Sequence, residues 1–151
     1  MNKKQIILII SIVVFIAALI GLSVFLNNLN TTKDNSTNTK TEEITRIDST
    51  QFEELVLNAN KPVLVDFYAD WCGPCRYLSP IVQEVAADKE YSNDFYFYKI
   101  NVDYESQLAA SYSVEYLPTL ILFRDGEAVL KSIGLVDKAT IINLLNSSKN
   151  I

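Results

Sequence analysis

The sequence predicts an α/β domain with a mixed central sheet covered by helices on both faces, preceded by one transmembrane helix. Two observations lead to this prediction. From residue 44 onward, helical and strand-like patterns alternate, which is typical of a sheet with helices packed on its two faces. Before that, Ile6 to Leu26 contains no charged residue, and as a helix this segment would span about 31 Å, close to the hydrocarbon thickness of a bilayer.

The apolar segment 6–26 is predicted to be a retained signal anchor. A cleaved signal peptide usually has a shorter apolar region of about 7–15 residues. Cleavage after Ser23 is the alternative, because the residues before it form a weak small-x-small site. Residues 1–5 carry two lysines and are predicted to stay in the cytoplasm, so the C-terminal domain is predicted to lie outside it.

Residues 27–43 are predicted to be a flexible linker. They are rich in Asn and Thr and lack the aromatic and β-branched apolar residues that could order them by burial. Residues 44–151 then form the folded domain. The expected location is therefore the cytoplasmic membrane of a bacterium, with one membrane pass and an extracytoplasmic domain.

The domain begins with a strand, a helix and a central strand. Residues 44–47 are a short strand candidate. Asp48 or Ser49 can cap a helix that runs to about Asn58 with an apolar stripe. Residues 63–68 form an almost continuous apolar run, which is typical of a strand buried on both faces.

The second half of the pattern adds a long helix and a hairpin. A helix beginning at the cysteine pair is predicted to end near Glu90, with Pro80 inside it. Asp125-Gly126 is a strong hairpin signal between two apolar runs. The remaining elements are a strand over 94–102, a helix over 106–112, hairpin strands over 119–124 and 127–133, and a closing helix from Asp137 or Lys138 to Asn146.

Composition excludes several classes of function. With a net charge of −5 and an isoelectric point near 4.7, no nucleic-acid partner held through phosphate contacts is expected. The chain has no histidine and two cysteines, which excludes histidine acid–base catalysis and any site of four soft ligands from one chain. We expect no metal and no cofactor.

The two cysteines form one C-x-x-C, Cys72 and Cys75, at the start of the long helix. The first cysteine faces the free amide groups and the positive end of the helix dipole, which favour its thiolate. The second lies about one turn further on and is expected to be less exposed. A thiolate at Cys72 can attack a partner's disulfide, and Cys75 can then resolve the mixed disulfide. Gly73-Pro74 between them suits a first helical turn.

The residues around this motif resemble the thioredoxin family over about Ile44 to Ser147. Residues 63–76 read VLVDFYADWCGPCR, close to the active-site strand and loop of the family. Further matches follow in order: Pro80, then KINVD at 99–103, YLPT at 116–119, FRDGE at 123–127, and Gly134. The resemblance implies the thioredoxin fold and a protein-disulfide oxidoreductase.

The resemblance also assigns roles to site residues. Cys72 and Cys75 would form the redox disulfide, Cys72 attacking and Cys75 resolving. Asp66 would lie beneath Cys75 and move its proton, with a pKa raised by desolvation, and Lys99 would be its charge partner. Pro118 would have a cis peptide bond and lie against Cys72. The substrate-binding residues would be Trp71, Gly73, Pro74, Pro118 and Gly134.

Simpler interpretations of these residues stay open. The cysteines could form a structural disulfide or half of a zinc site, although the chain offers neither Cys nor His to complete one. Asp66 could face solvent from an edge strand, and Lys99 could be a solvated strand residue. Trp71 could serve packing alone, and Pro118 could be an ordinary trans proline at the start of a strand.

The expected partners are protein disulfide substrates, an integral membrane thiol carrier that donates electrons, and the membrane itself. The leading interpretation is a reductase, because Gly-Pro between the cysteines resembles reducing thioredoxins. A disulfide-donating oxidase is the alternative, since extracytoplasmic compartments are usually oxidising. A thioredoxin-fold module that binds or chaperones clients without turnover is the third interpretation.

Overall fold

The structure, a computed structural model, describes Asn2 and residues 44–149 of the 151-residue chain. Apart from Asn2, the predicted cytoplasmic end, signal anchor and linker lie outside the described residues. In the part that is described, no helix has the length and apolar character needed to cross a bilayer.

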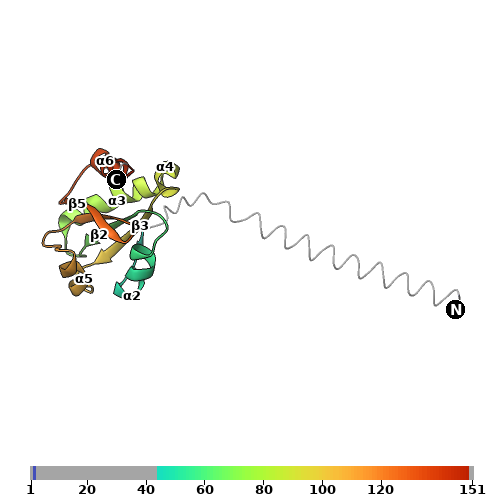
Figure 1. The fold of residues 1–151 in the computed structure, drawn as a ribbon, viewed down its shortest axis with the longest axis horizontal. Helices are drawn as coiled ribbons and strands as arrows, with labels where there is room; N and C mark the ends of the chain where they lie inside the picture. Colours follow the sequence, from blue (N-terminus) through green and yellow to red (C-terminus); the bar gives the residue numbers. More distant parts are fainter. Residues whose placement is uncertain (1, 3–43, 150–151) are drawn as a thin grey trace. The chain divides into compact units, whose positions relative to one another are not determined.

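A five-stranded mixed sheet forms the centre of the domain, in the order β1-β3-β2-β4-β5 (Figure 1). β2 pairs in parallel with β3 and antiparallel with β4. This central position explains the apolar run of β2, in which five of six residues are buried. The predicted mixed sheet is confirmed. Its strands are β1 (Thr45–Arg46), β2 (Val63–Tyr68), β3 (Tyr96–Asn101), β4 (Thr119–Arg124) and β5 (Glu127–Ile133).

Helices cover both faces of the sheet, as the sequence predicts. Figure 1 shows α3 and α6 on one side and α2 and α5 on the other. Leu64 of β2 belongs to the core cluster with α3 and α6, whereas Val65 and Phe67 belong to the opposite cluster. Side chains alternate along a strand, so Asp66 faces the α3 side. The helices are α2 (Ser49–Phe52), η1 (Glu53–Leu57), α3 (Gly73–Ala87), α4 (Lys89–Ser92), α5 (Ser106–Ser111) and α6 (Lys138–Ser148).

Two helices differ most from the sequence prediction, while α5 ends one residue early at Ser111 and α6 runs on to Ser148. The first helix changes at Glu53 into a π-helical turn, although Asp48 caps its start as expected. The long helix ends at Ala87 and does not reach Glu90, because Asp88 adopts an extended backbone. The Asp88 carboxylate accepts a hydrogen bond from the Glu90 amide at 3.0 Å and so begins the separate helix α4.

Candidate functional site

The two cysteines are joined by a disulfide at the amino end of α3. Cys72 is the N-cap residue, and its sulfur accepts a hydrogen bond from the amide of Cys75 at 3.2 Å. Gly73 and Pro74 occupy the first two helical positions, where proline removes no helical hydrogen bond. When the disulfide is reduced, the same amide and the helix dipole favour negative charge on the Cys72 sulfur.

The expected difference in exposure between the cysteines is wrong for this oxidised form. Both are 3% exposed, because the disulfide holds both side chains against the core cluster that includes Ala69. The two cysteines differ instead in the cavity that each one lines. Cys72 borders an open cleft of about 510 Å³, and Cys75 borders a separate pocket of about 240 Å³. The disulfide therefore lies between the cleft and a second, smaller pocket.

The cleft on the Cys72 side lies between two loops. Trp71 lines it from the active-site loop, Gly73 and Pro74 from the start of α3, and residues 114–117 from the loop before β4. The Leu117–Pro118 peptide bond is cis, as the resemblance implies. Thus three of the five predicted substrate-binding residues line this cleft.

Pro118 and Gly134 are not part of the cleft lining. Pro118 is buried, and its carbonyl oxygen accepts a hydrogen bond from the Gly134 amide at 2.7 Å. Gly134 has φ of +89°, a backbone conformation that favours glycine. The hydrogen bond between Gly134 and Pro118 therefore connects the start of β4 to the loop after β5. A direct substrate contact by either residue stays a prediction.

Asp66 lies in the pocket on the Cys75 side. The side chain is 4% exposed, and its Oδ1 atom has no hydrogen-bond partner. Burial raises the pKa of this carboxyl to about 7, while the charge of Lys99 opposes the shift. Asp66 and Cys75 line the same pocket, so the carboxylate can accept a proton from the Cys75 thiol near neutral pH.

Lys99 is placed opposite Asp66 in the register of β2 and β3 and lines the same pocket. Its ammonium lies over the Tyr68 ring, 5.6 Å from the centroid. Lys99 thus acts on Asp66 through its charge, in agreement with the predicted partnership. Its part in the reaction stays a prediction.

A polar network beside the cleft was missed by sequence reasoning. The Trp71 indole nitrogen donates to the Asp103 carboxylate at 3.1 and 3.2 Å. Asn101, only 1% exposed, donates to Asp70 and accepts from the Asp103 amide. The network orients Trp71, whose side chain is 68% exposed at the cleft rim. The KINVD segment contains two of these residues, but only the fold brings them next to Trp71.

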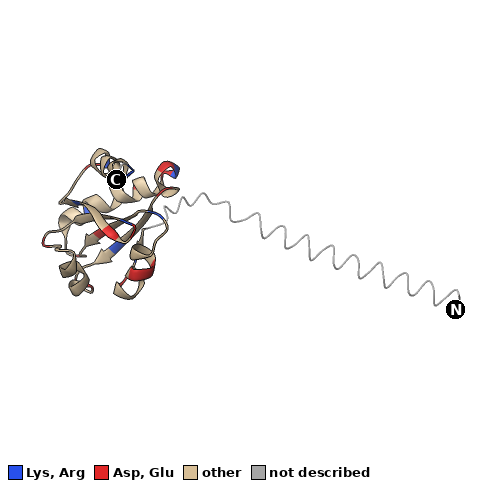
Figure 2. Cartoon of the chain, viewed as in Figure 1, with Lys and Arg blue, Asp and Glu red and all other residues tan. Residues whose placement is uncertain are grey.

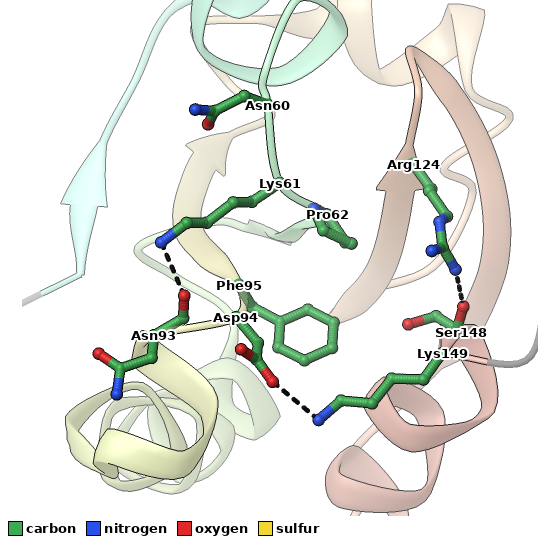
Figure 3. A pocket seen from close by; sticks show the side chains of 9 residues that line it. All are labelled: Asn60, Lys61, Pro62, Asn93, Asp94, Phe95, Arg124, Ser148 and Lys149. Atoms are coloured by element: carbon green, nitrogen blue, oxygen red, sulfur yellow. Dashed lines mark hydrogen bonds and ion pairs between the residues drawn. The ribbon is translucent and has the colours of Figure 1, made fainter.

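Another pocket, of about 300 Å³, lies where β2 and β3 begin and β4 ends (Figure 3). Lys61 precedes β2, Asp94 precedes β3 and Arg124 ends the antiparallel β4, so all three lie away from the cysteines. Lys61 donates to the Asn93 carbonyl at 2.7 Å, and Arg124 donates to the Ser148 carbonyl.

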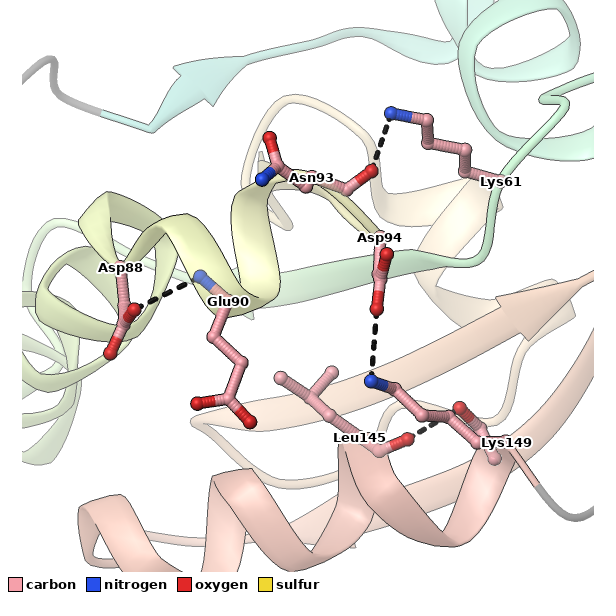
Figure 4. A network of polar contacts seen from close by, with 8 residues as sticks. Lys61, Asp88, Glu90, Asn93, Asp94, Leu145 and Lys149 are labelled. Carbon is pink, nitrogen blue, oxygen red and sulfur yellow. Dashed lines mark hydrogen bonds and ion pairs between the residues drawn. The ribbon is translucent and has the colours of Figure 1, made fainter.

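Contacts in this pocket hold the end of helix α6 against the rest of the domain. Lys149 pairs with Asp94 at 2.9 Å, and Figure 4 shows this pair between α6 and the segment that follows α4. The cations of the pocket therefore have partners within the protein, which makes this a structural region. Among residues 44–149, no group of three or more His, Cys, Asp or Glu side chains is placed to hold a metal ion.

The family model named Thioredoxin matches residues 43–147. A thioredoxin from Pyropia yezoensis is 44% identical over 68% of this chain and 94% of its own length. A thioredoxin from Chlamydia pneumoniae is 45% identical over 66% of this chain and 93% of its own. Among solved structures, a mutant thioredoxin from Halobacterium salinarum is 38% identical with a TM-score of 0.62, covering 70% of this chain and 89% of that one.

Proposed function

The chain belongs to the thioredoxin family, and we propose that it reduces protein disulfides at the outer face of a bacterial cytoplasmic membrane. That it is a protein-disulfide oxidoreductase follows from the family and its intact cysteine pair. The observation that carries the proposal is the position of the disulfide. Cys72 opens to the cleft, and Cys75 opens to the pocket with Asp66.

The geometry supports a two-step reduction of a substrate disulfide. In the reduced protein, the Cys72 thiolate attacks one substrate sulfur, and the other substrate sulfur leaves as a thiolate. Asp66 then accepts the Cys75 proton, and the Cys75 thiolate attacks Cys72 to release the second substrate thiol. Two electrons pass from the protein dithiol to the substrate, and the protein ends in the disulfide form that the structure shows.

The reducing direction is supported by Gly73-Pro74 between the cysteines, which resembles reducing thioredoxins. A reductase outside the cytoplasm needs electrons delivered across the membrane. We therefore include an integral membrane thiol carrier as the donor that converts the Cys72–Cys75 disulfide back to the dithiol.

The location is supported by the sequence before the domain. The uncharged segment 6–26 is long enough to span a bilayer once, and Lys3 and Lys4 precede it. These residues lie outside those that the structure describes. The linker 27–43 would join this anchor to the domain on the outer side.

The reduction potential of the Cys72–Cys75 pair tests the direction. We expect a value near that of thioredoxins in general, about −270 mV, when a fragment of residues 42–151 is equilibrated with a dithiothreitol series. A value near about −120 mV, which is typical of strong disulfide donors, would contradict the reductase proposal in favour of an oxidase.

Thiol labelling in intact cells tests location and direction together. We expect a membrane-impermeant maleimide to label the full chain without added reductant, because an outer-face reductase is kept reduced. The chain has two cysteines, so the double variant Cys72→Ser/Cys75→Ser is the unlabelled control. Labelling that requires lysis would contradict the location, and labelling that requires a reductant would contradict the direction.

A further inference from the structure

We propose that Glu115 makes the cleft selective for disulfide substrates that carry a cationic side chain beside the reactive cysteine. The inference rests on the proposed function and names the class of substrate for the same site. It starts from the charges and aromatic rings that line the cleft next to Cys72.

Among the described residues that line the cleft, Glu115 is the one that carries a charge. It lies in the loop before β4 and is exposed. The rest of the lining is apolar, aromatic or backbone from the active-site loop, and includes Val102 and Leu117. Over the rest of the described domain, acidic and basic residues are spread across several elements (Figure 2). Within the cleft lining, the charge that a substrate meets beside Cys72 is therefore the carboxylate of Glu115.

Other charged groups beside the active site lie outside the cleft lining, and one of them, Arg76, lines the separate pocket with Asp66. Asp103, which accepts the Trp71 indole hydrogen bond, adds a second carboxylate at the rim. Lys131 is held on the carbonyl oxygens of Tyr112 and Ser113, at 2.7 and 3.2 Å. Its ammonium contacts the backbone of the loop and is not part of the cleft lining.

Two aromatic side chains add a second reason for a cationic substrate. Trp71 and Tyr116 line the cleft from its two loops and are 68% and 66% exposed. Aromatic faces attract Lys and Arg cations and pack against their aliphatic stems. A Lys or Arg beside the substrate cysteine can thus place its stem on a ring and its charge near Glu115.

Fluorescent peptide disulfides provide the probe. Two symmetric disulfide dimers have the same short peptide, with either Lys or Glu next to the cysteine, and their fluorophores are quenched until reduction. The full-length reduced protein in non-ionic detergent gives up two electrons and two protons per dimer, which yields the Cys72–Cys75 disulfide and two peptide thiols. The ratio of kcat/KM for the Lys and Glu dimers measures selectivity, and general losses of activity cancel in this ratio.

We expect the wild-type ratio to favour the Lys dimer by about 5-fold at low salt and to approach 1 at high salt, as expected for a partly exposed charge pair. Glu115→Gln should bring the ratio close to 1, and Glu115→Lys should invert it. Glu127→Gln and Glu127→Lys are the matched controls. Glu127 begins β5 and pairs with Arg124 at the end of β4, so it lies at the opposite end of these strands from the cleft. Both controls should keep the wild-type ratio.

Two results separate this inference from the proposed function. If every variant reduces both dimers with an unchanged ratio, the selectivity by Glu115 is wrong while disulfide exchange stands. If the wild-type protein reduces neither dimer, the proposed function itself is contradicted.

Discussion

Replacing Cys72 with serine is expected to lower the rate of disulfide exchange by at least about 1000-fold, because a hydroxyl cannot form the mixed disulfide. Replacing Cys75 with serine should have a different result. Cys72 still borders the cleft and can attack a substrate, but no thiol remains to resolve the product. The Cys75→Ser variant should therefore accumulate a covalent complex with its substrate.

The measurement is non-reducing gel electrophoresis with a disulfide-bonded protein substrate. A band at the summed mass should appear for Cys75→Ser, disappear with dithiothreitol, and be absent for Cys72→Ser and for the double variant. If Cys72→Ser traps the substrate and Cys75→Ser does not, the assignment of the attacking and resolving cysteines is reversed. If neither variant traps the substrate but exchange is lost in both, the mixed-disulfide mechanism is wrong.

Three strands were predicted with their observed bounds because a strong local pattern defined each of them, whereas β1 and β3 are shorter than predicted. Both hairpin strands match their expected bounds, since Asp125-Gly126 fixes the turn and the flanking apolar runs fix the pairing. The buried β2 strand also matches, because a strand covered on two faces requires a continuous apolar run. Site residues within these segments, such as Asp66, were therefore placed correctly in the fold.

Helix ends and side-chain contacts were less predictable. Residues 88–90 are charged residues that do not by themselves end a helix, and the break at Asp88 depends on a backbone conformation that the apolar periodicity does not encode. The hydrogen bond between Trp71 and Asp103 joins residues 32 positions apart. Its formation depends on how the loops after β2 and β3 meet, which no local pattern specifies. The same is true of Glu115, which looks like an ordinary loop residue until the cleft is assembled.

The second large effect is expected from Asp66. Burial raises the pKa of its carboxyl to about 7, from an ordinary value of 3.8. At pH values between these two pKa values, the Asp66 carboxyl has lost its proton in the unfolded chain but keeps it in the folded protein. The free energy of unfolding therefore falls as pH rises from about 4 to about 7 and then levels off. The difference between the two pKa values corresponds to about 4 kcal/mol at pH 8.

For an Asp66→Asn variant, the free energy of unfolding should not fall over this pH range, because the amide stays neutral at every pH. Urea unfolding of the oxidised fragment 42–151 should show nearly equal stability for the variant and the wild type near pH 4. At pH 8 the variant should be more stable by about 4 kcal/mol. The matched control is Asp125→Asn, whose exposed side chain should change stability by less than about 0.5 kcal/mol at either pH.

The composition of this chain makes the assignment to Asp66 unusually direct. It contains no histidine, so the side chain that normally titrates between about pH 5.5 and 7.5 is missing. The other carboxyls with resolved pKa shifts, Asp48 and Asp137, are shifted downward, away from this range. A stability difference between wild type and Asp66→Asn that grows over this pH range therefore reports the ionisation of one buried carboxyl. A constant difference across that range would mean that Asp66 is not the group that can accept the Cys75 proton near neutral pH.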